Sequence, residues 1–290
     1  MKKIKKAVIP VAGLGTRFLP IAKTIPKEML PVVDKPLLHH IVLELVSAGI
    51  EQIILVTSSY KKAIEDYFDT SFEIEEKLKR AGKEEELKSL QAISKLADFS
   101  YVRQKEQRGN GDAFLTAKNL VGNETFVGCW GDDLLLSEPN RFVQIIKAYE
   151  KYGGNVLACL IKNEPEDANR YGFAKGEEIE PGVIEVEELI EKPGPLNKPS
   201  DLAVLSGFVF VPEIFEAWEN FPLKEGQELN YIDGLNYLRN KDIKTYALNI
   251  PGGKHYDCGN VLLYIKSNIE LSLKDPKIGE ELRAFIKTIQ

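Results

Sequence analysis

The sequence predicts an α/β fold: a mostly parallel mixed sheet with helices on both faces. Runs of apolar and β-branched residues alternate with amphipathic helical patterns along most of the 290 residues, and this alternation is typical of parallel strands joined by crossover helices. A glycine-rich segment at residues 13–31 follows the first apolar run. Because such sheets bind ligands at the carboxyl ends of their strands, this segment is expected to lie in a binding site.

The regular elements are predicted from residue periodicity and from their end signals. Pro36 suits the first position of a helix, and Gly49 suits the residue after its end. The predicted strands are Lys6–Val11, Gln52–Thr57, Phe99–Gln104, Thr125–Trp130, Asn155–Ile161 and Ala203–Val211. The predicted helices include Pro36–Ala48, Tyr60–Tyr67, Asp112–Leu120 and Arg141–Tyr152.

Two segments interrupt this alternation within what we predict to be a single domain, residues 1–290. Residues 71–98 are rich in Glu and Lys with apolar residues at roughly helical spacing, which predicts a charged insertion of amphipathic helices laid on the body. Its charges of mixed sign are typical of a solvated face, and an oligomer contact is the alternative. Residues 260–290 predict a C-terminal helical segment whose apolar surface must dock on something.

Composition narrows the class of protein. The chain carries 38 Lys and Arg against 44 Asp and Glu, a net charge of −6, which argues against a nucleic-acid partner because a phosphate backbone attracts a basic surface. Its widely spaced cysteines, Cys129, Cys159 and Cys258, indicate buried thiols in a reducing compartment. No secretion signal and no run of about 18 apolar residues occurs, so we expect a cytoplasmic protein without a membrane partner.

The glycine-rich segment reads GLGTRFLPIAKTIPKEMLP and indicates a polyphosphate site. Gly13 and Gly15 can adopt positive φ, so that backbone N–H groups converge on an anion, and Arg17 and Lys27 add positive charge. The dinucleotide-binding fingerprint is excluded because it needs glycine or alanine where Phe18 stands, and the Gly-Lys-Ser/Thr of a Walker motif is absent.

Two carboxylates follow predicted strand ends. Asp132 comes after Thr125–Trp130, and Asp257 lies in the sequence HYDCGN. Carboxylate and phosphate oxygens are ligands that a hard divalent cation prefers. The alternative is that both are turn aspartates, and the neighbouring Asp133 leaves open which residue of the Asp-Asp pair would bind.

Gln104 ends a predicted strand and is a candidate for binding a base. Its amide offers one acceptor and two donors, which match the N3–H and carbonyl edge of uracil. An amide can also flip to suit cytosine, so this residue alone does not decide between uridine and cytidine. A surface glutamine at a strand end is the alternative.

The segment Gly13–Pro31 closely resembles the signature of the sugar-phosphate nucleotidylyltransferases, specifically of the bacterial UTP–glucose-1-phosphate uridylyltransferases. The resemblance covers nearly the whole chain, and the charged middle and the tail match least. It implies a Rossmann-like nucleotide-diphospho-sugar transferase fold, Mg²⁺ as cofactor, and a homodimer or homotetramer. Further matching segments are VDKPLLHHIVLELVSAGI (Val33–Ile50), IILVT (Ile53–Thr57), YFDTSFEIE (Tyr67–Glu75), VRQ (Val102–Gln104), YGFA (Tyr171–Ala174), EKP (Glu191–Pro193) and DCGN (Asp257–Asn260).

The resemblance implies transfer of a uridylyl group from UTP to glucose 1-phosphate, giving UDP-glucose and pyrophosphate. The catalytic residues it implies are Arg17 on the leaving pyrophosphate, with Lys27 and Lys192 neutralising the reacting phosphates. It implies that Asp132 and Asp257 bind the magnesium ion. Gly172, Glu191 and Lys192 would bind the sugar phosphate. The implied nucleotide-binding residues are Ala12, Gly13, Leu14, Gly15, Thr16, Gln104, Gly109 and Gly111, the last two packing against the base.

Several positions depart from the family pattern. Asn110 and Asp112 stand where the family usually has Leu and His, and Ser206-Gly207 replaces Gly-Arg. Asp112 could instead cap a helix. Glu228 and Asp233 match acidic family positions in a stretch that otherwise differs, and we expect them to act on the site only through other residues.

These departures leave other readings open. The same reaction with dTTP or CTP, or with another hexose 1-phosphate, is the nearest alternative. A catalytically silent nucleotide-sugar sensor on the same fold is a second, although Arg17, Lys27, Asp132, Lys192 and Asp257 are all intact. A nicotinamide oxidoreductase is the third, and Phe18 counts against it.

Overall fold

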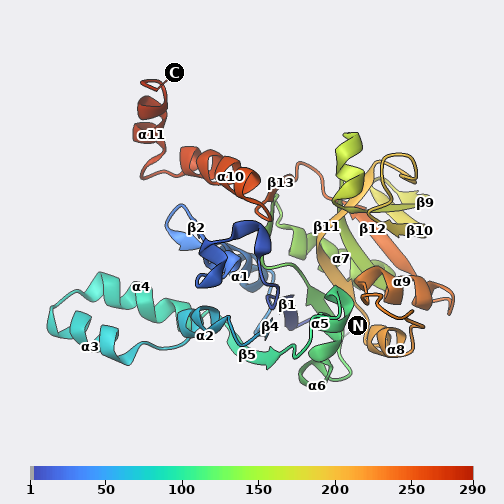
Figure 1. The fold of residues 1–290 in the computed structure, drawn as a ribbon, viewed down its shortest axis with the longest axis horizontal. Coiled ribbons are helices and arrows are strands. Elements are labelled where there is room, and N and C mark those ends of the chain that lie inside the picture. The colour runs from blue at the N-terminus through green and yellow to red at the C-terminus, as the bar shows by residue number, and fades with distance from the viewer. Residues whose placement is uncertain (1–2, 290) are drawn as a thin grey trace.

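A nine-stranded sheet with the order β5-β4-β1-β6-β11-β8-β12-β10-β9 organises the chain. This description rests on a computed structural model that describes residues 3–289 (Figure 1). The strands are β1 (Lys6–Pro10), β4 (Gln52–Thr57), β5 (Asp98–Arg103), β6 (Phe126–Gly128), β8 (Asn155–Ile161), β9 (Gly172–Glu180), β10 (Val183–Glu191), β11 (Leu202–Phe210) and β12 (Thr245–Asn249).

The sheet is mixed, as predicted, but it is not mostly parallel. Parallel pairing is confined to β5-β4-β1-β6 and to β8 with β12. Strand β11 runs antiparallel between β6 and β8, and β10 is antiparallel to both β12 and β9. One antiparallel pair has a local cause: β9 and β10 are joined by a tight turn containing Gly182 at φ +79°, and a connection of that length can only join antiparallel neighbours.

The four predicted helices are present with one division, and α8 and α9 are two further helices that were not predicted. The predicted helix Asp112–Leu120 consists of α5 and α6, which meet at Ala117. The helices of the body are α1 (Leu37–Ser47), α2 (Lys62–Phe68), α5 (Asn110–Thr116), α6 (Lys118–Val121), α7 (Arg141–Tyr152), α8 (Glu213–Glu219) and α9 (Tyr231–Arg239).

Helices cover both faces of the sheet, as predicted. Neighbouring residues of a strand point to opposite faces. On β11, a Cβ at Gly207 would lie 3.5 Å from Arg141 of α7, whereas the Phe208 ring meets the Phe114 ring of α5 at 6.4 Å. Helix α7 therefore lies on one face and α5 on the other. Helices α8 and α9 contact α5 and join it on its face.

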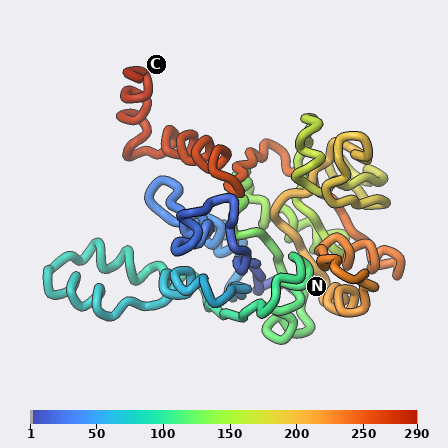
Figure 2. The backbone as a smooth tube through the Cα atoms, in the orientation of Figure 1, coloured from blue at the N-terminus to red at the C-terminus, as the bar shows by residue number. Residues whose placement is uncertain are grey.

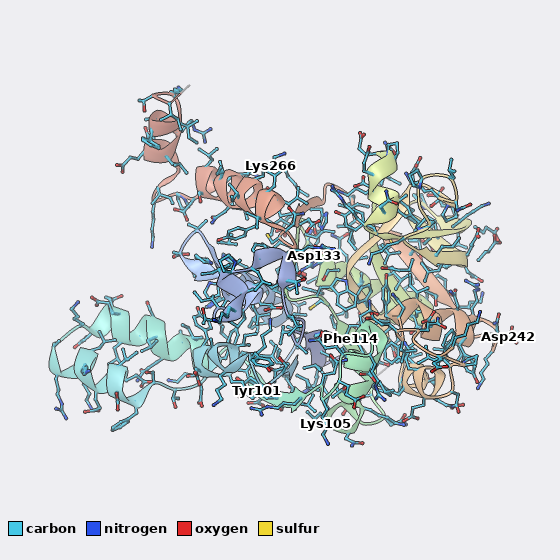
Figure 3. All side chains as sticks on the ribbon, viewed as in Figure 1. Tyr101, Lys105, Phe114, Asp133, Asp242 and Lys266 are labelled. Carbon is cyan, nitrogen blue, oxygen red and sulfur yellow. The ribbon has the colours of Figure 1, made fainter. Side chains whose placement is uncertain are left out.

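Two helical extensions leave the body, as the tube in Figure 2 shows. The first consists of α3 (Phe72–Arg80) and α4 (Glu84–Ser94), which pack on each other and contain no buried residue. These helices are present as predicted, but they project from the body instead of lying on it: Phe72 and Ile74 of α3 are 76% and 52% exposed, and Ile93 of α4 packs against the core.

The second extension is C-terminal and consists of α10 (Val261–Lys274) and α11 (Gly279–Ile286). Helix α10 docks on the N-terminal loop: the Tyr264 hydroxyl donates to the Pro31 carbonyl at 2.6 Å, and its ring meets Phe18 edge-on. No helix within residues 3–289 combines the length and apolar character that crossing a bilayer requires.

Candidate active site

Two adjoining cavities open at the carboxyl ends of β1, β5 and β6. The smaller, of about 290 Å³, is lined by the loop after β1, by Gln104 after β5 and by the start of α5. The larger, of about 550 Å³, is lined by residues of β9, β10 and β11 and by the segment around Asp257. The two cavities share Lys27, Asn110, Trp130 and Asp132, so together they form one continuous cleft.

The loop after β1 forms one wall of this cleft. Gly15 adopts the left-handed conformation at φ +64° and precedes the short helix η1 (Thr16–Phe18), which carries Arg17. Gly13 does not adopt positive φ. A Cβ on Gly15 would lie 3.5 Å from Lys27 Cγ, so the turn packs directly against Lys27 and helps to fix its position.

Lys27 and Asp132 meet where the two cavities join. Lys27 lies in the short helix η3 (Lys27–Met29), and its Nζ is 2.5 Å from Asp132 Oδ2. Burial would lower the pKa of Lys27, but the carboxylates of Asp132 and Glu28 outweigh it and hold that pKa above the usual lysine value. The ammonium is therefore charged and available to a phosphate.

Glu28 and Lys61 form a buried ion pair behind Lys27. Lys61 Nζ lies 2.7 Å from Glu28 Oε2. Burial raises the pKa of Glu28, and Lys61 and Lys27 oppose that rise. Lys61 precedes α2, so this pair ties the Lys27 loop to the body.

The two candidate metal ligands converge at Gly259. A methyl group on Gly259 would lie 3.0 Å from Asp257 Oδ1, 3.6 Å from Asp132 Oδ2 and 4.0 Å from Arg17 Nη1. A separate two-stranded antiparallel sheet of β7 (Asp133–Leu136) and β13 (Lys254–Asp257), which pairs Asp133 with Asp257, brings them there. Because Gly259 has no side chain, space remains between two carboxylates and a guanidinium.

Within residues 3–289 no set of three or more His, Cys, Asp or Glu side chains could hold a metal ion by itself. Two carboxylates suit Mg²⁺, which keeps waters and completes its coordination with substrate phosphates. Asp133 is engaged elsewhere, because its Oδ1 lies 2.7 Å from His255 Nε2. Asp132 is thus the member of the Asp-Asp pair whose carboxylate lines both cavities, where it pairs with the Lys27 ammonium.

We call the smaller cavity the nucleotide side and the larger cavity the sugar side, after the ligands that the resemblance implies. The nucleotide side contains Gln104 but only some of the predicted glycines. Gln104 and Gly109 line the smaller cavity. Gly111 does not: a Cβ there would lie 2.9 Å from the backbone of Asn230, so this glycine allows the start of α9 to approach α5. Asp112 does not cap α5, whose N-cap is Gly109; its carboxylate contacts Gln104 instead.

The sugar side is built from one row of paired residues. Glu191 at the end of β10 pairs with Gly172 at the start of β9, which also pairs with Val204 of β11. A Cβ on Gly172 would lie 3.0 Å from Glu191 Oε2 and 3.3 Å from the Tyr231 hydroxyl. Gly172 therefore leaves the Glu191 carboxylate accessible.

Lys192 completes this side from a left-handed backbone position. Its φ is +45°, its N–H donates to the Tyr171 carbonyl at 3.1 Å, and its Nζ lies 3.3 Å from Glu191 Oε1. Burial raises the pKa of Glu191, and the Lys192 ammonium opposes that rise. The carboxylate and ammonium both line the larger cavity.

Most of the predicted site residues thus come together. Arg17, Lys27, Asp132, Gly172, Glu191, Lys192 and Asp257 line the larger cavity, and Ala12, Gly13, Gln104 and Gly109 line the smaller one. Leu14, Gly15, Thr16 and Gly111 line neither. Sequence reasoning missed Trp130, Asn169, Arg170 and Tyr231, which also line the cleft. Asn169-Arg170 directly precedes the recognisable Tyr171-Gly172, so its position next to a motif was an available signal.

Of the remaining departures from the family pattern, Asn110 lines both cavities, whereas Ser206 lies outside direct reach of a ligand. Ser206 is buried; its Oγ accepts from the Trp130 N–H at 2.9 Å and its carbonyl accepts from Arg141. Glu228 lines the smaller cavity, whereas Asp233 forms the capping box of α9 with Asn230.

Comparison with known proteins agrees with this geometry. The family model described as nucleotidyl transferase matches residues 6–272. The chain is 43% identical over 290 residues to a UTP–glucose-1-phosphate uridylyltransferase of Staphylococcus epidermidis, covering 100% of this chain and 99% of the relative. It is 44% identical to the protein of the same name from Staphylococcus haemolyticus, with the same coverage.

Solved structures give the same result. A UDP-glucose pyrophosphorylase complexed with UDP-glucose superposes with a TM-score of 0.83 and 40% identity, covering 94% of this chain and 100% of that one. The UTP-bound enzyme from Acinetobacter baumannii gives a TM-score of 0.90 and 35% identity, with 99% and 100% coverage. The chain therefore belongs to the nucleotidyl transferase family and, within it, to the UTP–glucose-1-phosphate uridylyltransferases.

Proposed function

We propose that this protein transfers the uridylyl group of UTP to glucose 1-phosphate, releasing pyrophosphate and forming UDP-glucose. The observation that carries the proposal is the meeting of two cavities at Lys27 and Asp132. One cavity has a base-reading amide, and the other has a carboxylate and an ammonium suited to a sugar phosphate. The names of the relatives, and the UDP-glucose and UTP bound to two of the solved structures, support these substrates.

The smaller cavity would hold the nucleotide. Gln104 would read the base, while the backbone around Ala12 and Gly13 would lie along the ribose and phosphates. Arg17, across the cleft near Asp257, would hold the leaving pyrophosphate. The α-phosphate would then lie at the junction, beside Lys27.

The larger cavity would hold glucose 1-phosphate. Glu191 would accept hydrogen bonds from vicinal sugar hydroxyls, and the Gly172 backbone would approach the ring. Lys192 and Arg170 would pair with the sugar phosphate. A phosphate oxygen of the sugar would thereby face the α-phosphorus.

The residues then catalyse the reaction by position and charge. The sugar-phosphate oxygen attacks the α-phosphorus in line, the bond to the bridging oxygen breaks, and pyrophosphate leaves. No protein nucleophile is needed, since transfer of this kind depends on alignment and charge stabilisation. Lys27 and Lys192 reduce the repulsion between the two anionic substrates, and Arg17 stabilises the charge of the leaving group.

A divalent cation, Mg²⁺, fits the space at Gly259. Asp132 and Asp257 would hold it, and its charge would offset that of the phosphates when it is bound. Lys27 pairs with Asp132, so this lysine lies next to the place where the cation and the reacting phosphates would meet.

The test is a pyrophosphate-release assay with glucose 1-phosphate and each of UTP, CTP, dTTP and ATP, with and without Mg²⁺. We expect UTP to be preferred and turnover to require the cation. Lys27→Ala should lower kcat about 10²- to 10³-fold, as the loss of one preorganised charge does. The matched control is Lys23→Ala, because Lys23 is exposed in the same loop and lines neither cavity.

The alternatives give different outcomes in this assay. Preference for dTTP or CTP, or for another hexose 1-phosphate, would change the substrate but keep the reaction. Absence of turnover with bound UDP-glucose would favour a silent sensor. Near-full turnover by Lys27→Ala would contradict the assigned chemistry, and binding of NAD would favour the oxidoreductase reading.

We further propose a single catalytic domain, a cytoplasmic location and a homodimer or homotetramer. The free, buried cysteines support a reducing compartment. Leu262, Ile265 and Ile269 of α10 are 60%, 46% and 46% exposed, and such an apolar face supports contact between copies. Light scattering of the purified protein measures the oligomeric mass directly.

A further inference from the structure

The amide of Gln104 is held in one orientation by its protein neighbours. Gln104 follows β5 and lines the smaller cavity. Its Nε2 donates to Asp112 Oδ2 at 2.8 Å and to the Gly109 carbonyl at 3.3 Å. Both partners of this nitrogen are therefore acceptors.

Asp112 is itself fixed as an acceptor. It is 6% exposed and lies in the first turn of α5, where the helix dipole favours negative charge. Its second oxygen, Oδ1, lies 2.9 Å from Arg108 Nη2. A carboxylate paired with a guanidinium accepts hydrogen bonds and donates none. Reversing the Gln104 amide would place its Oε1 against two acceptors, so the reversed orientation is disfavoured.

The orientation leaves one group of Gln104 for a ligand. Within residues 3–289 no group donates to Oε1, so the polar atom that this side chain offers to the cavity is an acceptor. Uracil carries a donor at N3, whereas cytosine carries an acceptor there. Two facing acceptors repel, and cytosine could bind well only if the amide reversed.

We propose that Asp112, held by Arg108, is a specificity-determining positioning residue: it locks Gln104 so that the site accepts uracil and rejects cytosine. The proposal rests on the proposed uridylyl transfer. We call this fixed orientation of the Gln104 amide the lock. Thymine presents the same N3–H as uracil, so the lock cannot distinguish these two bases. The lock separates UTP from CTP but not UTP from dTTP.

The test compares kcat/KM for UTP, CTP and dTTP in wild type and in Asp112→Asn. Asparagine has nearly the same shape but can donate as well as accept, so a reversed Gln104 amide would face one acceptor, the more distant Gly109 carbonyl, instead of two. We expect the UTP:CTP ratio to fall about 10- to 100-fold, the range for an unpaired buried hydrogen-bonding group, with kcat/KM for CTP rising. The UTP:dTTP ratio should stay constant. A purely structural defect would lower all three values together.

Asp98→Asn is the matched control, because Asp98 is exposed at the opposite end of the same strand, and its ratios should equal those of wild type. If Asp112→Asn is poorly soluble, Asp112→Ser removes the obligate acceptor and should relax the ratio likewise. An unchanged UTP:CTP ratio in a folded Asp112 variant overturns the lock. Absence of uridylyl transfer by the wild type would instead contradict the proposed function. The lock is then judged by calorimetry, where equal affinity of the wild type for UTP and CTP overturns it.

Discussion

The nucleotide side and the sugar side of the cleft each contain a Glu–Lys ion pair, and the two pairs differ in burial. The side chains of Glu28 and Lys61 are 2% and 5% exposed, whereas those of Glu191 and Lys192 are 23% and 55% exposed. The first pair is almost completely buried, with Glu28 in the wall of the smaller cavity, and the second lines the larger cavity.

This difference assigns the two pairs to different tasks. A buried pair contributes most by its geometry, because removing one partner leaves a charge without compensation. An exposed pair contributes little to stability, since water screens it, and its groups remain available to a substrate. The nucleotide side is thus held by a pair of almost completely buried charges, whereas the sugar side presents more exposed charges to the ligand.

Breaking the buried pair should have the largest effect on folding. Lys61→Met leaves the Glu28 carboxylate buried with Lys27 as its remaining cation, and we expect the free energy of unfolding to fall by about 3–5 kcal/mol. Urea unfolding measures this change. The control is Lys62→Met, which alters an exposed neighbour. Its free energy of unfolding should stay within about 0.5 kcal/mol of the wild-type value.

The double variant Glu28→Gln with Lys61→Met removes both charges and should recover part of the loss, since replacing a whole buried pair is often neutral. A loss below about 1 kcal/mol in the single variant would mean that the buried pair behaves like the exposed one. The comparison between the two sides would then fail.

The two sides also differ in how well the sequence predicts them. The loop after β1 is recognisable because its glycines and cations are adjacent in the chain, and β4 and β8 have the predicted bounds. On the sugar side, β9, β10 and β12 were not predicted. In β10 the buried residues Val183, Val186 and Leu189 recur every third position, because register shifts interrupt the alternation that marks a strand.

Contacts between distant residues lie beyond sequence reasoning for a different reason. Nothing in the local pattern of Asp112 distinguishes a helix cap from a partner of Gln104, because the choice depends on how α5 sits against β5. The same holds for Glu28 with Lys61 and for Asp132 with Asp257. Sequence thus predicts which residue types line the cleft, and the packing of strands and helices decides which of them touch.

Acidification tests the packing behind the buried pair, because α1 carries a buried histidine that contacts α2. His39 of α1 is 6% exposed and its Nδ1 lies 2.8 Å from the Tyr67 hydroxyl of α2, the helix that Lys61 precedes. Burial lowers the pKa of His39 from 6.5 to about 4. The unfolded chain therefore binds this proton at a higher pH than the folded protein does.

Stability consequently falls as the pH is lowered from 6.5 to about 4, and the shift corresponds to about 3 kcal/mol of unfolding free energy. His39→Gln removes the titrating group, so its unfolding free energy should vary less over that interval when measured by urea titration at several pH values. Parallel profiles for wild type and variant would show that His39 does not titrate as its burial implies.

The smallest expected effect on folding lies at Lys192 and separates strain from charge. Its φ of +45° is unfavourable for any residue with a Cβ, by about 1–2 kcal/mol. Glycine relieves this strain, but it also makes the unfolded chain more flexible, which offsets part of the gain in stability. We expect Lys192→Gly to leave the unfolding free energy unchanged or raised by up to about 1 kcal/mol, while kcat falls about 10²-fold through loss of the ammonium.

Lys192→Met is the matched variant, because it loses the same charge but keeps the strained backbone. The two variants should have similar turnover, with the glycine variant the more stable by urea unfolding. If the glycine variant is instead the less stable, the left-handed position is not strained. If either variant keeps wild-type turnover, the exposed pair has no role in the reaction. If both variants lose turnover and the glycine variant is the more stable, the sugar side keeps a strained backbone at Lys192 that positions its ammonium. On the nucleotide side, by contrast, the burial of Glu28 and Lys61 contributes to the stability of the fold.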